Sequence, residues 1–362
     1  MRIVLDAMGG DLGPRPCVEG ALAACRRFNI EVVLVGKERH LRRLVSASRT
    51  RDRRLSIVHA EDVVRMKDSP RESLRKKKSS LAIAVDMVRT GEASAVVSPA
   101  NTGAFLAHAL MAWRTLPGIK KPAIATLLPT MHDRVVIIDS GAVVDCKPHQ
   151  LVNFAIMGAT YAREVLGRVN PRIGLLSIGE EETKGNELVL ETNPLLRKTG
   201  LNFLGNAEGR DIFTGDFDVV VCDGFVGNVV LKTSEGLART ITELLKREAK
   251  RSAPTMIGGA LMYPAIKSLK HRVDYDEIGG APLLGVNGIA IISHGSSNSK
   301  AIMNALRVAA EAVTRNLVRR VREDLEKYHD QMERRGVSHE VVTGEAPPPP
   351  GPKADGVLRG GR

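Results

Sequence analysis

Five short apolar runs in this chain each end in a cluster of glycine and small polar residues. In an open α/β sheet, ligands bind where strands end and helices begin. Small residues at such ends let backbone N–H groups approach a ligand, and helix N-termini favour an anion. The repetition therefore predicts one site that binds phosphate or another oxyanion. The five clusters are Asp6-Ala7-Met8-Gly9-Gly10-Asp11, Ser98-Pro99-Ala100-Asn101-Thr102-Gly103, Asp139-Ser140-Gly141, Asp223-Gly224-Phe225-Val226-Gly227-Asn228 and Ser293-His294-Gly295-Ser296.

Strand-like and helix-like segments alternate along most of the chain. Most strand candidates are short and apolar on both faces, as expected for strands of a covered parallel sheet. The alternation predicts βαβ units and a three-layer α/β/α sandwich. A hairpin over 122–138 would make the mostly parallel sheet a mixed one. The strand candidates are 2–6, 31–36, 55–60, 94–98, 123–128, 134–139, 172–178, 217–222 and 288–292, and the helix candidates are 15–28, 37–47, 79–90, 102–114, 148–167, 186–198, 228–250 and 297–328.

The composition limits the partners and the compartment of the chain. With 362 residues, 43% of them hydrophobic, the chain can bury a large core. The formal net charge of +12 favours an acidic partner, although a solvated basic surface explains it equally well. An aromatic content of 3% argues against nucleic-acid binding by base stacking. The four cysteines show neither a Cys-x-x-Cys pair nor a zinc spacing, and no signal peptide or membrane-spanning run is visible, which indicates a reducing cytoplasm.

The common cofactor and nucleophile motifs do not occur in the sequence. The histidines at 108, 132, 149 and 294 are scattered and form no His-Glu-x-x-His pattern. There is no Gly-x-Ser-x-Gly elbow, no P-loop and no Gly-x-Gly-x-x-Gly fingerprint. We therefore expect neither a metal nor a cofactor, and anion binding by loops remains.

Several of the clusters have a purely structural alternative. Gly9 and Gly10 could do no more than form a tight turn between strand and helix. Asp6 and Asp11 could cap helix donors rather than contact a ligand. Asn101 opens a helix candidate, so capping explains it about as well as phosphate binding does.

Two other segments favour a functional interpretation. The cluster that begins at Asp223 holds two glycines and Asn228 between a buried strand and a helix. Lys184 lies in a loop that ends another strand and is followed directly by Gly185 and a helix candidate. Its ammonium could bind phosphate as a point charge, or it could simply be solvated.

Taken in order, these motifs resemble those of the bacterial phosphate acyltransferase family PlsX. The match runs from residue 1 to about residue 321, and several of its motifs are long and unusual. Pro99 departs from the pattern, which has a smaller residue there, and its missing N–H cannot bind phosphate. The matching motifs are 6–11, 101–103, Asp145-Cys146-Lys147-Pro148, 178–181 with 184–186, Gly205-Asn206-Ala207-Glu208-Gly209, 223–228 and 291–296.

The resemblance implies a fold like that of the phosphotransacylases and of isocitrate dehydrogenase. It implies an enzyme that converts a long-chain acyl-[acyl-carrier protein] and inorganic phosphate to acyl phosphate and free carrier protein. The product would feed phosphatidic acid and phospholipid synthesis through a membrane glycerol-3-phosphate acyltransferase of the PlsY type. The resemblance also implies a homodimer that attaches peripherally to the membrane. It implies neither a cofactor nor binding of nucleic acid.

By the same resemblance, Lys184, Asn228 and His294 are the expected catalytic residues. Phosphate is already a nucleophile at neutral pH, so the site needs placement and preorganised donors rather than a Ser or Cys nucleophile. A structural role for His294 at the end of its strand remains an alternative. The residues expected to contact phosphate or the acyl group are Asp6, Gly9, Gly10, Asp11, Asn101, Thr102, Gly103, Gly185, Asn186, Asp223, Gly224, Gly227, Gly295 and Ser296.

The segment from residue 65 to residue 78 holds seven basic and two acidic residues. A segment with this charge density is expected to be exposed. Because acyl-carrier proteins are strongly acidic, the resemblance suggests that it docks one. The docking candidates are Arg71, Arg75, Lys76, Lys77 and Lys78.

The segment 253–285 combines apolar residues with a basic edge, as an interfacial helix would. Packing on the body or in a dimer interface is the alternative. The residues expected to meet an anionic membrane surface are Met256, Ile257, Leu261 and Ile266.

The sequence is expected to form one phosphate acyltransferase domain over 1–330, with 253–285 as a protruding amphipathic helical segment. The tail 331–362 is rich in Pro and Gly and is expected to be disordered. The alternatives left open are a short-chain acyl-CoA phosphotransacylase, a dehydrogenase of the same fold and, in another class, a basic nucleic-acid-binding protein.

Overall fold

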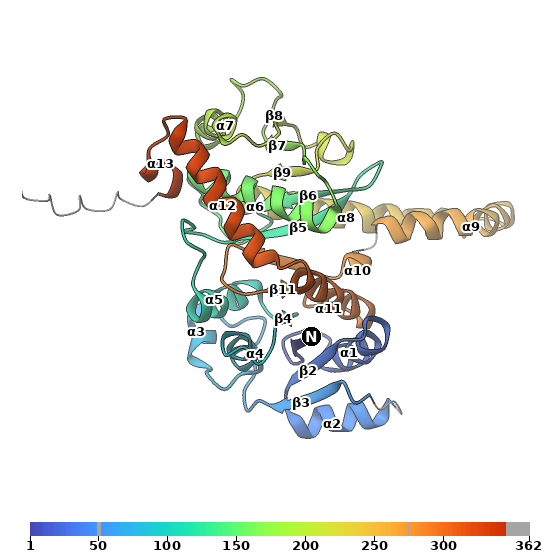
Figure 1. Cartoon of the computed structure of the whole chain (residues 1–362). Coiled ribbons are helices and arrows are strands. Elements are labelled where there is room, and N and C mark those ends of the chain that lie inside the picture. The colour runs from blue at the N-terminus through green and yellow to red at the C-terminus, as the bar shows by residue number, and fades with distance from the viewer. Residues whose placement is uncertain (49–51, 274, 345–362) are drawn as a thin grey trace, which may run out of the picture.

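The computed structural model describes residues 1–48, 52–273 and 275–344 and has one central sheet covered by helices on both faces (Figure 1). Within these residues the sheet has 11 strands in the order β3-β2-β1-β4-β11-β10-β5-β6-β9-β7-β8. The strands are β1 Arg2–Asp6, β2 Glu31–Gly36, β3 Leu55–His59, β4 Ala95–Ser98, β5 Ala123–Pro129, β6 Arg134–Ile138, β7 Ile173–Leu176, β8 Phe203–Ala207, β9 Val219–Val221, β10 Ala281–Leu284 and β11 Ala290–Ile292.

Helices connect most of the strands, and most of these helices cover the faces of the sheet. They are α1 Arg15–Phe28, α2 Glu38–Ala47, α3 Pro70–Arg75, α4 Ser80–Arg89, α5 Thr102–Trp113, α6 Pro148–Leu166, α7 Glu187–Thr199, α8 Gly224–Ala249, α9 Ala253–Val273, α10 Tyr275–Ile278, α11 Ser299–Thr314, α12 Leu317–Arg334 and α13 His339–Thr343.

Most of the strands are buried on both faces, as expected for three layers, whereas the edge strand β3 has no fully buried residue. In β1, Ile3 and Leu5 pack in a cluster with α1 and α11, while Val4 packs in a second cluster with α4 and α5. Successive side chains of a strand point to opposite faces, so an apolar residue at every position means helices on both sides. The hydrophobic effect of burying both faces is the main force that holds the layers together.

The direction of the strands reverses within the sheet. Strands β3, β2, β1, β4 and β11 are parallel, and β10 is antiparallel to both β11 and β5. The expected hairpin β5–β6 is present, and β9, β7 and β8 run parallel to β6. The carboxyl ends of β6, β9 and β7 therefore lie at the opposite edge of the sheet from those of β1, β4 and β11. The five clusters therefore do not share one edge of the sheet, because the β5–β6 hairpin separates them into two groups.

Some boundaries also differ from the sequence expectation. Strands β8 and β10 were not expected. The single helix expected over 297–328 is two helices, because the chain turns at Asn316, whose φ is 52°.

The expected disorder from residue 331 is wrong for residues 331–344. Helix α12 continues to Arg334, and α13 follows. Met332, Val337 and Val342 are buried in the same cluster as α6. These three apolar side chains give the segment a place to pack, and the rest of the expected tail, 345–362, lies outside the described residues.

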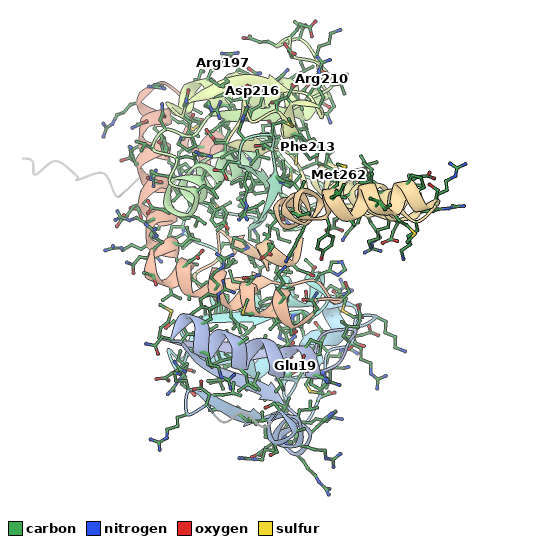
Figure 2. All side chains as sticks on the ribbon, turned by 90° about the vertical axis from the view of Figure 1, so that its right-hand side faces the viewer. Glu19, Arg197, Arg210, Phe213, Asp216 and Met262 are labelled. Carbon is green, nitrogen blue, oxygen red and sulfur yellow. The ribbon has the colours of Figure 1, made fainter. Side chains whose placement is uncertain are left out.

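Helices α8 and α9 form a pair that projects from the body (Figure 1). In α8 the buried residues are two glycines at its start, Gly224 and Gly227. The side chains of residues 254–267 on α9, Met262 among them, are directed away from the body (Figure 2). Leu261 is 78% exposed and Ile257 is 65% exposed. The segment expected to protrude was 253–285, but residues 281–284 form the buried strand β10, which pairs with β5 and β11 in the sheet. None of the helices in the described residues has the length and apolar character of a membrane span.

Candidate active site

The loops that follow β1, β4 and β11 meet at one edge of the sheet. The N–H of Asp11 donates to the carbonyl oxygen of Gly295 at 2.8 Å. A β-carbon on Gly9 would lie 2.7 Å from the β-carbon of Ala100, and one on Gly295 would lie 2.5 Å from Oδ2 of Asp11. These glycines are needed because the three loops pack backbone against backbone. The amide of Asp11 is already paired in this arrangement.

Asp6 organises this edge from within. It has no exposed surface, and its carboxylate accepts from the Ser98 hydroxyl at 2.8 Å and from the N–H of Met8 at 3.1 Å. Burial raises the pKa of this carboxyl, and the hydrogen bonds from Ser98 and Met8 oppose that shift. Asp6 therefore ties β1 to β4, a structural role that differs from the helix capping considered for it.

Three of the expected ligand residues cap helices. The Oδ1 of Asn101 accepts from the N–H of Ala104 at 3.0 Å, and that of Asn186 accepts from the N–H of Val189 at 3.0 Å. Asp223 accepts from the first amides of α8. Thr102 and Gly103 begin α5 directly after its cap. Capping, worth about 0.5–2 kcal/mol each, accounts for these residue types at these positions.

Asn101 also joins the basic segment to this edge. Its Nδ2 donates to the carbonyl oxygen of Met66 at 2.8 Å. The methyl group of Met66 lies against Gly295, and Pro70 at the start of α3 lies against Gly103. The expected docking segment is thus held beside the loops of the N-terminal half.

Within that segment, one of the five expected docking residues is paired locally. The Nζ of Lys76 lies 2.6 Å from Oδ2 of Asp68 and also donates to the carbonyl oxygen of Val63. Arg71, Arg75, Lys77 and Lys78 are exposed. Of these, Lys78 pairs with the exposed Glu61.

At the opposite edge, Asp139 holds a tight loop against the start of α8. Its carboxylate accepts from the N–H groups of Ile124, Gly141, Ala142 and Val143 at 2.7–3.1 Å. Burial raises its pKa to about 6, against the effect of these hydrogen bonds. Asp139 opens one of the five clusters in the sequence, but its own side chain was not expected to organise the loop.

Gly224, Gly227 and Asn228 pack on that loop. The N–H of Gly224 donates to the carbonyl oxygen of Val143 at 2.8 Å. A β-carbon on Gly227 would overlap the carbonyl oxygen of Asp139. The glycines therefore allow close approach of two backbones, and Gly141 lies beside the side chain of Asn228.

Lys184 lies in the loop after β7, at the same edge as Asn228. Its carbonyl oxygen accepts from the Ser177 hydroxyl at 3.1 Å and from Nδ2 of Asn206 at 3.3 Å. Its side chain is exposed, and the ammonium has no hydrogen-bond partner among the described residues. Gly185 has a φ of +125°, which a residue with a side chain rarely adopts.

Helix α8 connects the two edges. It begins at the carboxyl end of β9, and at about 1.5 Å per residue its third turn lies about 12 Å further on. There the Nζ of Lys232 is 3.3 Å from Nε2 of His294, in the loop after β11. Lys232 is four residues beyond Asn228 and so shares its side of the helix. Lys232 was not expected from the sequence, because only the fold brings its side chain close to that of His294.

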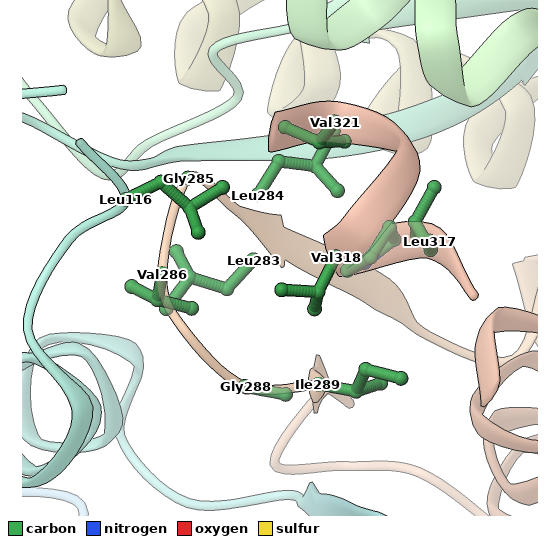
Figure 3. A pocket seen from close by; sticks show the side chains of 12 residues that line it. Leu116, Leu283, Leu284, Gly285, Val286, Gly288, Ile289, Leu317, Val318 and Val321 are labelled. Carbon is green, nitrogen blue, oxygen red and sulfur yellow. The ribbon is translucent and has the colours of Figure 1, made fainter. Parts of the chain in front are cut away.

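Two pockets in the part of the chain that the structure describes are lined by residues other than the expected catalytic ones. An apolar one of about 10 Å³ lies between β10, β11 and α12 (Figure 3) and is barely large enough for one water. A polar one of about 280 Å³ lies at the amino ends of β6, β7 and β9. There Arg168 and Arg172 are paired with Asp133 and Asp218. Among the described residues no group of His, Cys, Asp and Glu is arranged to hold a metal ion.

The fold is shared with solved acyl-transferring enzymes. A phosphotransacetylase from Streptococcus pyogenes superimposes with a TM-score of 0.60 at 17% identity, over 87% of this chain and 94% of that one. A branched-chain phosphotransacylase from Enterococcus faecalis V583 gives a TM-score of 0.52 at 15% identity, over 86% of this chain and 99% of that one. At this identity the likeness concerns the fold alone, and it confirms the expected fold class.

Sequence comparison is more specific. The family model described as "Fatty acid synthesis protein" matches residues 1–320. A phosphate acyltransferase from Pelotomaculum thermopropionicum is 50% identical over 327 residues, 90% of this chain and 95% of the relative. One from Geobacter sulfurreducens is 49% identical over 327 residues, 90% of this chain and 94% of the relative. The protein is thus an acyltransferase. The chain belongs to the PlsX family of phosphate acyltransferases, as the motifs indicated.

Proposed function

We propose that the acyl donor of this enzyme is a long-chain acyl-[acyl-carrier protein], and that its acyl phosphate serves phospholipid synthesis. The hydrogen bond from Asn101 to the carbonyl oxygen of Met66 supports this choice of donor, because it holds the basic segment beside the loops of the N-terminal half. An acidic carrier protein bound to Arg71, Arg75 and Lys77 would deliver its thioester close to those loops.

The reaction needs placement more than a protein nucleophile. A phosphate oxygen attacks the thioester carbonyl, a tetrahedral oxyanion forms, and the carbon–sulfur bond breaks as the thiolate takes up a proton. Donors that are already in place when charge develops lower the barrier, and removing one such donor typically costs about 10²–10³ in rate. In the proposal Asn228 holds the acyl oxygen or phosphate, Lys184 assists the phosphate or the leaving sulfur, and His294 takes part in proton transfer.

The glycine-rich loops serve this site by permitting close packing. Gly9, Gly10 and Gly295 let three loops meet at one edge, and Gly224 and Gly227 place α8 against the loop held by Asp139. In this proposal, backbone amides of the loops after β1, β4 and β11, together with Ser296, contact the phosphate. The amide of Asp11 is not among them, because it is bonded to Gly295.

The protruding helices give the enzyme two further surfaces in this proposal. Helix α9 would lie on an anionic membrane surface, with Met256, Ile257, Leu261 and Ile266 toward the lipid. The exposed apolar residues of α8, such as Leu237 and Leu244, would pack in a homodimer. A cytoplasmic enzyme attached peripherally in this way would release acyl phosphate near a PlsY-type membrane glycerol-3-phosphate acyltransferase.

The decisive experiment is incubation of the purified protein with palmitoyl-acyl-carrier protein, with and without inorganic phosphate. Acyl phosphate is trapped with hydroxylamine as the hydroxamate, and free carrier protein is followed on conformationally sensitive gels. We expect phosphate-dependent formation of both. Asn228→Ala is the matched inactive variant, with Asn202→Ala on the surface as its control.

A short-chain acyl-CoA phosphotransacylase is the second candidate, since solved proteins of that activity share the fold. Acetyl-CoA, butyryl-CoA and palmitoyl-CoA replace the carrier protein in parallel reactions. A higher kcat/KM with any of these than with palmitoyl-acyl-carrier protein would overturn the proposed donor.

A further inference from the structure

Asn206, at the end of β8, is buried against the loop that carries Lys184. Its Nδ2 donates to the carbonyl oxygen of Glu181 at 2.8 Å and to that of Lys184 at 3.3 Å. The N–H of Lys184 donates to the same carbonyl oxygen of Glu181 at 3.0 Å, which closes a four-residue turn. One side-chain amide therefore holds the first and the last residue of this turn.

The groups around Asn206 determine how its amide is oriented. Carbonyl oxygens only accept, so the amide nitrogen must be the atom that faces Glu181 and Lys184. Its Oδ1 then accepts from Nδ2 of Asn193 on α7 at 3.0 Å. The Oδ1 of Asn193 accepts in turn from Nε of Arg197 at 3.2 Å, and a guanidinium only donates. Exchanging nitrogen and oxygen in either amide would break at least two of these bonds.

This chain of hydrogen bonds returns to the same turn. The guanidinium of Arg197 pairs with the carboxylate of Glu182, which is itself a residue of the turn. Asn193 and Asn206 are both buried, and a hydrogen bond is stronger in such surroundings than in water. The turn is thus tied to β8 through Asn206 and to α7 through Arg197.

The position of the Lys184 side chain depends on this turn. Its ammonium has no hydrogen-bond partner among the described residues, so its backbone decides where the side chain starts. A β-carbon on Gly179 would lie 2.9 Å from Cγ of Lys184, which means that the first methylene groups of the lysine pack on that glycine. A turn that opened would carry these groups off the glycine.

We infer that Asn206 is a positioning residue of this enzyme, because its side-chain amide holds the turn from Glu181 to Lys184 and thereby places the Lys184 ammonium for the reaction. The part that concerns the reaction rests on the role of Lys184 in the proposed function. The part that concerns the turn rests on the hydrogen bonds alone.

Hydrogen exchange followed by mass spectrometry tests the turn without turnover. Asn206→Ala should speed exchange of the Lys184 amide about 10-fold, the usual effect of losing one hydrogen bond. Asn202→Ala is the matched control, because Asn202 directly precedes β8 and its Nδ2 donates to the carbonyl oxygen of Asn170, which is not part of the turn. The control should keep the wild-type rate of exchange.

Steady-state kinetics test the positioning. Asn206→Ala should lower kcat about 10²-fold, as a misplacement of about 1 Å can do, and leave the KM for acyl-carrier protein unchanged. In a Lys184→Ala background the same substitution should cost no further activity, because Asn206 acts through Lys184. A purely structural role would lower the activity of both backgrounds by the same factor.

Asn193→Ala provides a second route if Asn206→Ala does not fold. It keeps Asn206 and removes only the bond that orients its amide. Exchange of the Lys184 amide should again rise and kcat should again fall, each by less than in Asn206→Ala.

The outcomes separate this inference from the proposed function. A wild-type enzyme that makes no acyl phosphate from acyl-carrier protein overturns the proposed donor, while the exchange experiment still decides whether Asn206 holds the turn. Wild-type exchange of the Lys184 amide in Asn206→Ala overturns the inference. Faster exchange with a wild-type kcat overturns the positioning role and leaves Asn206 as a structural residue only.

Discussion

The backbone of Gly227 lies against the carbonyl oxygen of Asp139, so closely that a β-carbon at Gly227 would overlap that oxygen. This contact places the first turn of α8, and with it Asn228, on the loop that Asp139 holds through its backbone bonds. The position tolerates no side chain without a shift of one of the two backbones.

Gly227→Ala is therefore expected to destabilise the fold by about 1–3 kcal/mol, the usual range for overpacking in a tight interior. Gly236→Ala is the control, because it lies on the same helix with nothing within 4 Å of an added β-carbon. There alanine should stabilise by up to about 1 kcal/mol through helix propensity. Urea unfolding of both variants measures the difference, and a change of the same sign in both would contradict the packing argument.

The buried His329 is expected to make the free energy of unfolding fall in acid. It is buried, its Nε2 lies 2.7 Å from Oδ1 of Asn153, and burial lowers its pKa to about 4. The unfolded chain, with an ordinary histidine pKa near about 6.5, binds the proton first as the pH falls. The stability that the neutral ring contributes is thus present above about pH 6.5 and is lost as the pH falls toward about 4, by up to about 1.4 kcal/mol per pH unit.

His329→Gln should flatten this part of the pH dependence, because glutamine can donate to Asn153 without titrating. Unfolding free energies at pH 7 and pH 5 give the slope. The exposed His40→Gln on α2 is the control, and equal slopes in the wild type and His329→Gln would refute the assignment.

Reversing charges in the docking segment is expected to change only the KM for acyl-carrier protein. Arg71→Glu with Lys77→Glu should raise the KM for acyl-carrier protein and leave the KM for phosphate unchanged, and the effect should weaken with added salt. Lys76 is left intact, because its salt bridge to Asp68 is local. Arg39→Glu with Arg43→Glu on α2 has the same charge change at another surface. If both pairs raise the KM equally, net charge rather than docking is the cause.

Leu261 on α9 is expected to contact lipid. Flotation with liposomes rich in phosphatidylglycerol should carry the wild type, and Leu261→Glu should float less, because a charge in the apolar face opposes insertion at the interface. Met111→Glu is the control, because Met111 on α5 is 72% exposed and so resembles Leu261 in its exposure to solvent. This variant should float as the wild type does. Light scattering after gel filtration checks that Leu261→Glu keeps its oligomeric state, and equal flotation of all three proteins would exclude α9 as the membrane contact.

Much of the local structure was visible in the sequence. The apolar runs of β1, β4 and β11 and their polar ends follow from period and composition, because a strand covered on both faces is apolar at each position. Capping by Asn101 was considered because that residue precedes a helix candidate. Capping by Asp223 was not foreseen, because the helix expected from residue 228 begins at Gly224. Strand β8 was missed because Gly205 and Asn206 interrupt its apolar pattern. The end of α12 and the whole of α13 were missed because their few apolar residues pack only on a surface that α6 provides.

The sequence by itself determined the layers, the family and the kinds of residue that end each strand, since these depend on local pattern and motif. The tertiary structure decided which of those ends meet. The β5–β6 hairpin and antiparallel β10 reverse the strand direction, so two groups of loops lie at opposite edges and a lysine in the third turn of α8 reaches a histidine after β11. The contact joins residues 62 positions apart in the chain, and no local pattern encodes such a distance.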